Sequence, residues 1–362
     1  MELFQDIIRI LFLCVVCFIA SNYKYRSSHV SNWWIIALLL MICLIPTGGD
    51  YVHYEIVYKD FKSSGLTANL EDAYVPILQI SWSYTIFRII IWGGALGLVL
   101  FTFSRLGISL NTGLFFFASL FVCVFSYARV SLAMAFVITG YSFLIGSNQK
   151  SSIIIVFRLL IGGAILYFSL FFHKSIGFMV LCIPLSFLNL KPKGFILLTI
   201  LFPVLVYFAN HYLLDLLYGL QFIEDEELIT DAIVTQSEGE KMVYGLGKTI
   251  SQYLLYSPLY LLQLFFQYDI NKGTIVINRS QKRVLDFAFF IVYFSSVFAF
   301  LDFGTRVFYY RFLFMAYLPT ILACSSILKS KMTYRTKYKL VMLIAIVAQV
   351  YSMAYDTYLT AL

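Results

Sequence analysis

Long apolar runs recur along the whole chain, and short polar turns separate them. A helix of about 20 apolar residues is long enough to cross the hydrocarbon core of a bilayer. Hydrophobic residues make up 61% of the 362 residues and charged residues 12%, whereas a soluble domain carries about 25% charged residues. This pattern excludes an ordinary soluble domain and predicts an all-α polytopic integral membrane protein.

Twelve of the apolar runs have the length and composition of transmembrane helices. They cover residues 4–20, 30–46, 82–103, 110–126, 129–146, 151–172, 174–190, 194–213, 249–268, 284–301, 310–328 and 338–356. The segment from Glu71 to Trp82 is compatible with an interfacial or re-entrant helix before the third span. No internal repeat or linker interrupts the series, so we expect a single transmembrane domain over residues 1–362.

Basic residues are distributed unevenly between the predicted loops. Numbered along the chain, the odd loops carry 15 basic residues and one acidic residue, Asp269, whereas the even loops carry 8 basic and 14 acidic residues. Loops rich in Lys and Arg stay in the cytoplasm, so we expect both termini and all even loops outside. Two even loops are long, residues 47–81 and 214–248, so we expect the chemistry at the outer face. The chain has no Lys/Arg-rich arm of the kind that binds nucleic acid, so we expect no nucleic-acid partner.

The first long outer loop begins with two glycines, an acid and several tyrosines. Asp50 follows directly after the second predicted span, and Tyr51 and Tyr54 come next. Tyrosines beside a carboxylate suit sugar recognition, because flat ring faces meet sugar rings and polar groups meet hydroxyls. The alternative is that Asp50 caps a surface helix and that the tyrosines anchor it at the membrane interface.

Three basic residues lie at the ends of two neighbouring apolar hairpins. If the runs between them cross the bilayer, Arg129, His173 and Lys174 emerge on one side and Lys150 on the other. An Arg that begins a helix opposes the favourable direction of the helix dipole, so Arg129 calls for an anionic partner. The alternatives are that Arg129 reaches a lipid phosphate and that His173 is structural.

Further arginines extend this group. Arg306 and Arg311 lie in the outer loop before the eleventh predicted span. A guanidinium binds phosphate through two parallel hydrogen bonds, so three arginines on one face suit a pyrophosphate, and sulfate or lipid headgroups are the alternative ligands. Arg88 is expected about two turns into the third span, where it would face a substrate cavity from within the membrane.

The sequence also lacks the motifs of a nucleotide-dependent enzyme. It contains no phosphate-binding Gly-x-x-x-x-Gly-Lys-Ser/Thr loop and no cytoplasmic Asp-x-Asp pair. An enzyme that works at the outer face has no nucleotide supply, so its donor must arrive already activated, as a lipid-linked diphosphate does. The acidic run Glu224–Glu227 is interpreted as a solvated loop rather than a metal site, and we expect no cofactor.

Short motifs give the chain a family resemblance. Gly49-Asp-Tyr-x-x-Tyr54 follows the second span, Arg129-x-x-x-Ala133 begins the fifth, and Phe172-His-Lys-Ser-Ile-Gly177 begins the seventh. Together with an Arg in the last third, Arg306 or Arg311, these motifs resemble the EpsG-type family. That family comprises exopolysaccharide and O-antigen repeat-unit polymerases (Wzy). The resemblance covers about residues 30 to 330, and Lys174 stands where a small residue is commoner.

The resemblance implies a metal-independent glycosyltransferase in the inner membrane of a bacterium. Two undecaprenyl-pyrophosphate-linked oligosaccharides meet at the outer face, and an acceptor hydroxyl attacks the anomeric carbon of the donor chain. The implied base is His173, with Asp50 as second choice. The residues implied to bind substrate are Arg129, Arg306, Arg311, Lys174, Tyr51, Tyr54 and Arg88. Membrane lipids and a chain-length regulator protein are the other implied partners.

Three alternatives stay open at this point. A flippase or other transporter of lipid-linked oligosaccharides needs charges near the bilayer midplane and related halves, and only Arg88 favours it. An O-antigen-ligase-like transferase shares the donor, the membrane face and the need for arginines. A membrane scaffold leaves the grouped outer arginines without a purpose.

Overall fold

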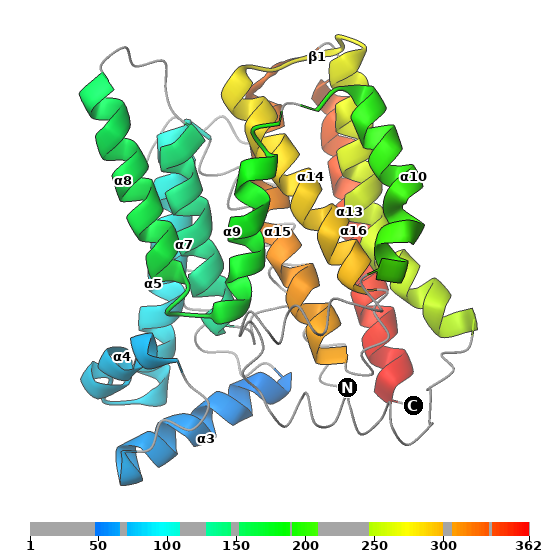
Figure 1. The fold of residues 1–362 in the computed structure, drawn as a ribbon. Coiled ribbons are helices and arrows are strands. Elements are labelled where there is room, and N and C mark those ends of the chain that lie inside the picture. Colours follow the sequence, from blue (N-terminus) through cyan, green and yellow to red (C-terminus); the bar gives the residue numbers. More distant parts are fainter. Residues whose placement is uncertain are drawn as a thin grey trace. The chain divides into compact units, whose positions relative to one another are not determined.

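The computed structural model describes residues 48–65, 71–108, 128–145, 152–188, 190–208, 246–299, 306–332 and 335–361, in two compact units (Figure 1). Unit 1 (Met1–Ile176) contains α3 (Gly48–Ser64), η1 (Asp72–Tyr74), α4 (Val75–Ile80), α5 (Tyr84–Leu106), α7 (Ala128–Ile145), α8 (Ser152–Ser169) and η3 (Lys174–Ile176). Unit 2 (Gly177–Leu362) contains α9 (Gly177–Leu185), α10 (Pro192–Phe208), α13 (Leu246–Asn271), β1 (Ile275–Val276), α14 (Arg279–Ala299), α15 (Arg306–Lys329), β2 (Lys331–Met332) and α16 (Arg335–Ala361).

Most of the described residues are helical, as the apolar periodicity predicted. Each predicted span that falls on them overlaps a helix of the structure. Among the described helices, α5 and α8 are both long and apolar enough to cross a membrane. The predicted spans 4–20, 30–46 and 110–126 lie outside the described residues, as does most of the predicted loop 214–248. The number of twelve spans and their orientation therefore stay predictions.

Residues 47–81, which we predicted to be a long outer loop, are largely helical in the structure. Helix α3 occupies most of its first part, and η1 and α4 follow, so the segment from Glu71 to Trp82 is helical over residues 72–80. The Tyr58 hydroxyl of α3 donates to the Ser81 carbonyl at 2.9 Å. Two residues later, Ser83 caps α5 by accepting a hydrogen bond from the Ile86 backbone N–H. These contacts attach the loop to the beginning of α5.

Helix α8 exposes apolar side chains along most of its length. Ile153, Phe157 and Leu160 are between 62% and 70% exposed, whereas Gly162, Leu166 and Ser169 are buried. A helix that leaves so much apolar surface uncovered in water would be costly, because burial of that surface is the main force that stabilises a fold. The exposed face of α8 therefore suits contact with lipid.

The buried face of α8 packs closely against α7 at two glycines. A Cβ atom at Gly140 would lie 2.9 Å from the Gly162 carbonyl oxygen, and a Cβ at Gly162 would lie 3.0 Å from the Gly140 carbonyl oxygen. Small residues let two membrane helices approach until their backbones touch. The glycines thus permit the α7–α8 contact on which the position of the following turn depends.

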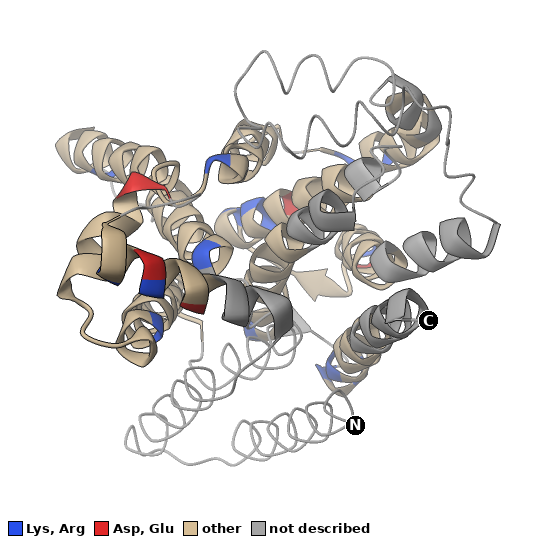
Figure 2. Cartoon of the chain, turned by 90° about the horizontal axis from the view of Figure 1, so that it is seen from below, with Lys and Arg blue, Asp and Glu red and all other residues tan. Residues whose placement is uncertain are grey.

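Several polar groups inside the apolar helices of unit 1 are hydrogen-bonded across or along those helices. The Thr102 hydroxyl of α5 lies 3.0 Å from the Thr139 hydroxyl of α7. Arg158, in the middle of α8, donates to the Phe143 carbonyl at 3.0 Å. Charged residues occupy few positions on the described helices (Figure 2). Hydrogen bonds of this kind matter inside a membrane, because a polar group without a partner costs roughly several kcal/mol in hydrocarbon.

In unit 2, α14 packs against α15, and α13 packs against α16. The two short strands β1 and β2 pair in antiparallel register, Ile275 with Met332 and Val276 with Lys331. The prediction of an all-α chain missed this ladder, because two-residue strands carry no detectable alternation of polar and apolar residues. The ladder joins the α13–α14 connection to the α15–α16 connection.

The position of Asp269 corrects a second prediction. We expected this acid in a cytoplasmic loop, but it lies near the end of α13, is 5% exposed, and accepts a hydrogen bond from the Tyr338 hydroxyl at 2.6 Å. Another buried acid, Asp286 of α14, accepts from the Gln267 amide at 2.8 Å and pairs with Lys282. These acids tie the helices of unit 2 together.

The glycine contact between α7 and α8 generates a prediction about stability. We expect Gly162→Ala to lower the Tm in detergent, because the new Cβ would lie 2.9 Å from Leu144 and 3.0 Å from a backbone oxygen. Overpacking of this kind costs about 1–3 kcal/mol. Gly163→Ala is the matched control, since a Cβ there meets nothing within 4 Å. An equal Tm for the two variants would contradict the close contact.

Candidate functional site

The candidate site begins at Arg129, the second residue of α7. Its guanidinium Nη1 donates to Glu71 Oε2 at 2.9 Å, and its Nε donates to the Tyr54 hydroxyl at 2.8 Å. The guanidinium carbon also lies 4.7 Å from the centre of the Tyr54 ring. Arg129 therefore has the anionic partner that its place at a helix start called for, and that partner is a carboxylate of the same chain.

Glu71 occupies the extended residue that leads into η1. Its backbone carbonyl accepts a hydrogen bond from the Tyr74 N–H at 2.9 Å, and Pro76 lies in the first turn of the short helix α4. Tyr74 is fully buried, and its hydroxyl donates to the Arg129 carbonyl at 3.1 Å. The turn and the phenol together hold the Glu71 carboxylate at the beginning of α7.

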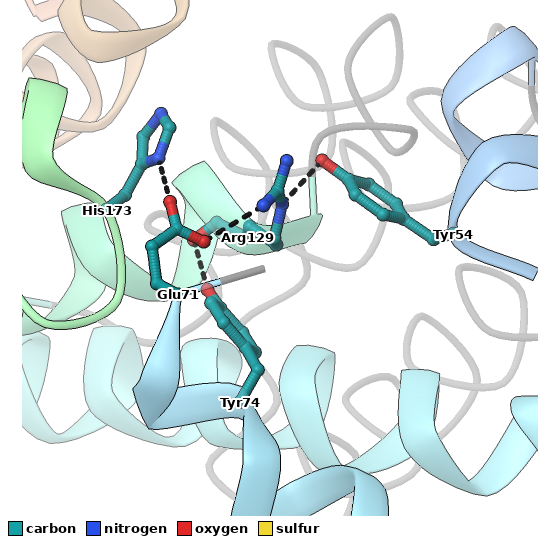
Figure 3. Close-up of polar contacts among 5 residues, drawn as sticks. All are labelled: Tyr54, Glu71, Tyr74, Arg129 and His173. Atoms are coloured by element: carbon teal, nitrogen blue, oxygen red, sulfur yellow. Dashed lines mark hydrogen bonds and ion pairs between the residues drawn. The ribbon is translucent and has the colours of Figure 1, made fainter. Parts of the chain in front are cut away.

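His173 approaches the same carboxylate from the turn that follows α8. Its Nδ1 lies 2.7 Å from Glu71 Oε1, so the two oxygens of Glu71 contact His173 and Arg129 respectively (Figure 3). The side chains of Glu71, Arg129 and His173 are only 17%, 12% and 10% exposed. We call the five residues Tyr54, Glu71, Tyr74, Arg129 and His173 the Glu71 cluster.

The charges of the cluster control the ionisation of its acid. Burial alone would raise the pKa of Glu71, but the His173 hydrogen bond and the charges of Arg129 and His173 outweigh that effect, so the pKa lies below its ordinary 4.5. Burial, followed by the charge of Glu71, raises the pKa of Tyr74 well above 10.0. Glu71 is thus a carboxylate and Tyr74 a neutral phenol at physiological pH.

The structure brings together three of the residues that the sequence singled out, Arg129, His173 and Tyr54. Lys174, beside His173, is exposed in η3 and does not belong to the Glu71 cluster. Arg88 is buried in the second turn of α5, and the substrate cavity that we expect it to face stays a prediction.

Four other candidates have described backbone positions only. Asp50 and Tyr51 lie in the first turn of α3, and Arg306 and Arg311 lie in the first two turns of α15. Their side chains are outside the described part of the structure. Their roles in substrate binding or catalysis stay predictions.

Glu71 and Tyr74 are the members of the Glu71 cluster that the sequence did not reveal. The chain has 19 acidic residues, and Glu71 stands in a loop with several of them. The one available signal was the predicted side of the membrane, because Glu71, Arg129 and His173 were all expected at the outer face. Sidedness alone does not select one carboxylate among many, because it says nothing about distances within a face.

Comparison with known proteins assigns the chain that carries this cluster to a family. The model of the EpsG family matches residues 33–362, which include every residue of the Glu71 cluster. The chain belongs to the EpsG family. The resemblance suggested by the short motifs is therefore confirmed, and the family and the apolar helices indicate a membrane protein. Searches of the curated proteins and of the solved structures each found no significant match.

The chemistry open to this EpsG-family site follows from its groups. It combines a permanent cation, an imidazole and a carboxylate, so it can bind an anion and move a proton. In the described part of the chain, no three His, Cys, Asp or Glu side chains group together as a metal site would require.

The Glu71 cluster generates a prediction about pH dependence. Because the folded-state pKa of Glu71 is depressed below 4.5, its contribution to stability is complete above about pH 4.5 and is lost as the pH falls through the folded value. We expect Glu71→Gln to cost about 1.5–3 kcal/mol at pH 7, the range for a hydrogen bond to a charged group. The Tm difference between wild type and variant should shrink on acidification.

Glu55→Gln is the matched control for that measurement. Glu55 pairs with Lys59 one turn along α3, and both side chains are more exposed than the Glu71 cluster, at 33% and 68%. Exposed ion pairs contribute roughly 0–1 kcal/mol. A Tm loss for Glu71→Gln that equals the loss for Glu55→Gln at pH 7 would contradict the energetic importance of the cluster.

Proposed function

We propose that this EpsG-family protein is a polysaccharide polymerase of the bacterial cytoplasmic membrane. It joins undecaprenyl-pyrophosphate-linked repeat units of an exopolysaccharide or O-antigen at the outer face. The observation that carries the proposal is the Glu71 cluster, in which a cation suited to a diphosphate and an imidazole suited to proton transfer contact one carboxylate. Family membership supports the same reaction class.

In the proposed reaction, an acceptor hydroxyl oxygen attacks the anomeric carbon of the donor chain. A new glycosidic C–O bond forms as the bond from that carbon to the pyrophosphate oxygen breaks. Undecaprenyl pyrophosphate leaves with the electron pair of the broken bond, and the proton of the hydroxyl passes to a base. The chain grows by one repeat unit without any nucleotide.

Charge stabilisation is the largest contribution that we assign to the protein. Negative charge grows on the leaving pyrophosphate, and cations already in place stabilise it without reorganising. Arg129 is our first choice because Tyr54 holds its guanidinium by a hydrogen bond and by ring contact. Arg306 and Arg311 are proposed to add charge, and Lys174 is the fourth cation. The diphosphate must share Arg129 with Glu71 or displace it.

His173 is the proposed base. In a neutral imidazole whose Nδ1 bears the proton, Nε2 carries the lone pair that accepts a proton. A well-placed base contributes roughly 10²–10⁴-fold in rate. Asp50 is the second choice, and Tyr51 and Tyr54 are proposed to contact sugar rings. Arg88 is proposed to contact the donor from within α5.

Two other functions use the same kind of donor. A flippase would be favoured by Arg88, whose burial in α5 puts a charge inside an apolar helix. A ligase would transfer finished polymer to another lipid, and it needs the same cations. Membrane lipids and a chain-length regulator protein are the proposed partners of the polymerase. The length of the polysaccharide on the surface of a deletion strain distinguishes the polymerase from these two functions.

A deletion strain tests the polymerase directly. We expect single repeat units on the cell surface, because flipping and ligation continue while chain growth stops. Wild-type protein should restore polymer ladders on a gel, whereas Arg129→Ala and Arg306→Ala should be present in the membrane and make none. Surface polysaccharide that is absent altogether from the deletion strain would favour a flippase or a ligase.

Lys59→Ala is the matched control for the arginine variants. It removes one positive charge from an exposed position in α3, with a side chain 68% exposed, so ladders should be normal. Arg129→Lys keeps the charge but loses the planar fork, so we expect shortened ladders. Ladders of normal length from Arg129→Ala or Arg306→Ala would rule out the role of that arginine.

The role of His173 predicts a division between kinetic constants. We expect His173→Ala to lower kcat by about 10²–10⁴-fold, the range for loss of a base. Binding of the lipid-linked donor should change much less, because Arg129 and the other cations remain. Purified protein and lipid-linked repeat units give both constants. A weakened donor affinity with unchanged kcat would assign His173 to binding instead.

A further inference from the structure

We infer that Glu71 is the positioning residue of the proposed base: it holds the His173 ring through Nδ1 and partners the imidazolium that forms when Nε2 takes a proton. The inference rests on the proposed function and adds to it a residue that the family motifs did not include. Glu71 itself need not touch the substrate, and its effect on the reaction passes through His173.

The geometry of the carboxylate carries this inference. Glu71 Oε1 lies 2.7 Å from His173 Nδ1, while Oε2 accepts from Arg129 at 2.9 Å (Figure 3). A carboxylate accepts hydrogen bonds and cannot donate them, so the proton of that contact belongs to Nδ1. The neutral ring then has its lone pair on Nε2. One contact thus selects both the tautomer and the orientation of the ring.

The surroundings of Glu71 keep it charged and in place. Arg129 neutralises one oxygen, and the Tyr74 turn holds the backbone of Glu71 against the beginning of α7. Among the described residues, the titratable and charged groups around His173 include Glu71 and Tyr74 from the η1 segment, Arg129 from α7, and Lys174 beside it. Tyr74 is neutral and Lys174 repels an imidazolium, so Glu71 is the group of this set that favours the charged ring.

A purely structural role for Glu71 makes a different prediction. If Glu71 served only to pair with Arg129, its loss would lower activity whether or not residue 173 were a histidine. If it acts through His173, its loss should have no further effect on turnover once the imidazole has been removed. A double-mutant cycle separates the two roles, because residues that act through one another are not additive.

The first experiment measures kcat and donor KM with purified lipid-linked repeat units. We expect Glu71→Gln to lower kcat by about 10- to 100-fold, the loss that a small misplacement of a reacting group causes. Glu71→Asp, which keeps the charge, should recover part of that loss. In the His173→Ala background, Glu71→Gln should leave kcat unchanged. An equal fold-loss in both backgrounds would overturn the inference. Glu55→Gln, at a half-buried acid of α3 outside the Glu71 cluster, is the control.

The second experiment does not depend on activity. Histidine labelled with ¹⁵N in membrane-embedded protein reports the ring protonation of the four histidines, and His173→Ala identifies the His173 signal by its loss. We expect the midpoint of the His173 titration to fall by about one pH unit or more in Glu71→Gln, because an adjacent opposite charge is removed. Glu71→Asp should keep much of the wild-type midpoint. An unchanged midpoint and tautomer in Glu71→Gln would overturn the inference.

The two experiments distinguish the inference from the proposed function. If wild-type protein fails to join lipid-linked units, the polymerase proposal fails, while the labelled-histidine titration still shows whether Glu71 governs the state of His173. If wild-type protein polymerises and the titration midpoint is the same in Glu71→Gln, the polymerase proposal stands and the inference about Glu71 fails.

Discussion

The candidate site of unit 1 is held together by the Glu71 carboxylate, which contacts both Arg129 and His173. The carboxylate joins the lead-in to η1, the beginning of α7 and the turn after α8. A buried charge is costly unless it is paired and hydrogen-bonded, so each member of the Glu71 cluster makes the burial of the others tolerable. The same pairing gives the site its ionised acid and its oriented imidazole.

The rest of the described chain follows the same constraint in weaker form. Several buried polar groups of the apolar helices are hydrogen-bonded between helices, as Thr102 is with Thr139 in unit 1 and Asp269 with Tyr338 in unit 2. Helices α7 and α8 also come into close backbone contact at Gly140 and Gly162, which have no side chains to keep them apart. The α7–α8 contact connects this packing to function, because Arg129 lies at one end of α7 and His173 follows α8.

Membership of the EpsG family and the Glu71 cluster point in the same direction from independent observations. Family membership is consistent with polysaccharide synthesis, and the cluster supplies a cation and an imidazole in one place. A reaction with a pyrophosphate leaving group needs little acid catalysis. The guanidinium of Arg129 and the imidazole of His173 are therefore the groups from which we propose charge stabilisation and proton acceptance.

The amino-acid sequence by itself determined the mostly helical class of the described residues, the positions of their long apolar helices, and the family. Those features depend on local composition and periodicity, which a single chain displays directly. The spacing of two apolar hairpins also grouped Arg129 and His173 at one predicted face. Only the tertiary structure selected Glu71 as their shared partner, placed Asp269 in a helix and paired β1 with β2. These outcomes depend on distances between segments far apart in the chain, and neither hydropathy nor the sign of a charge records such distances.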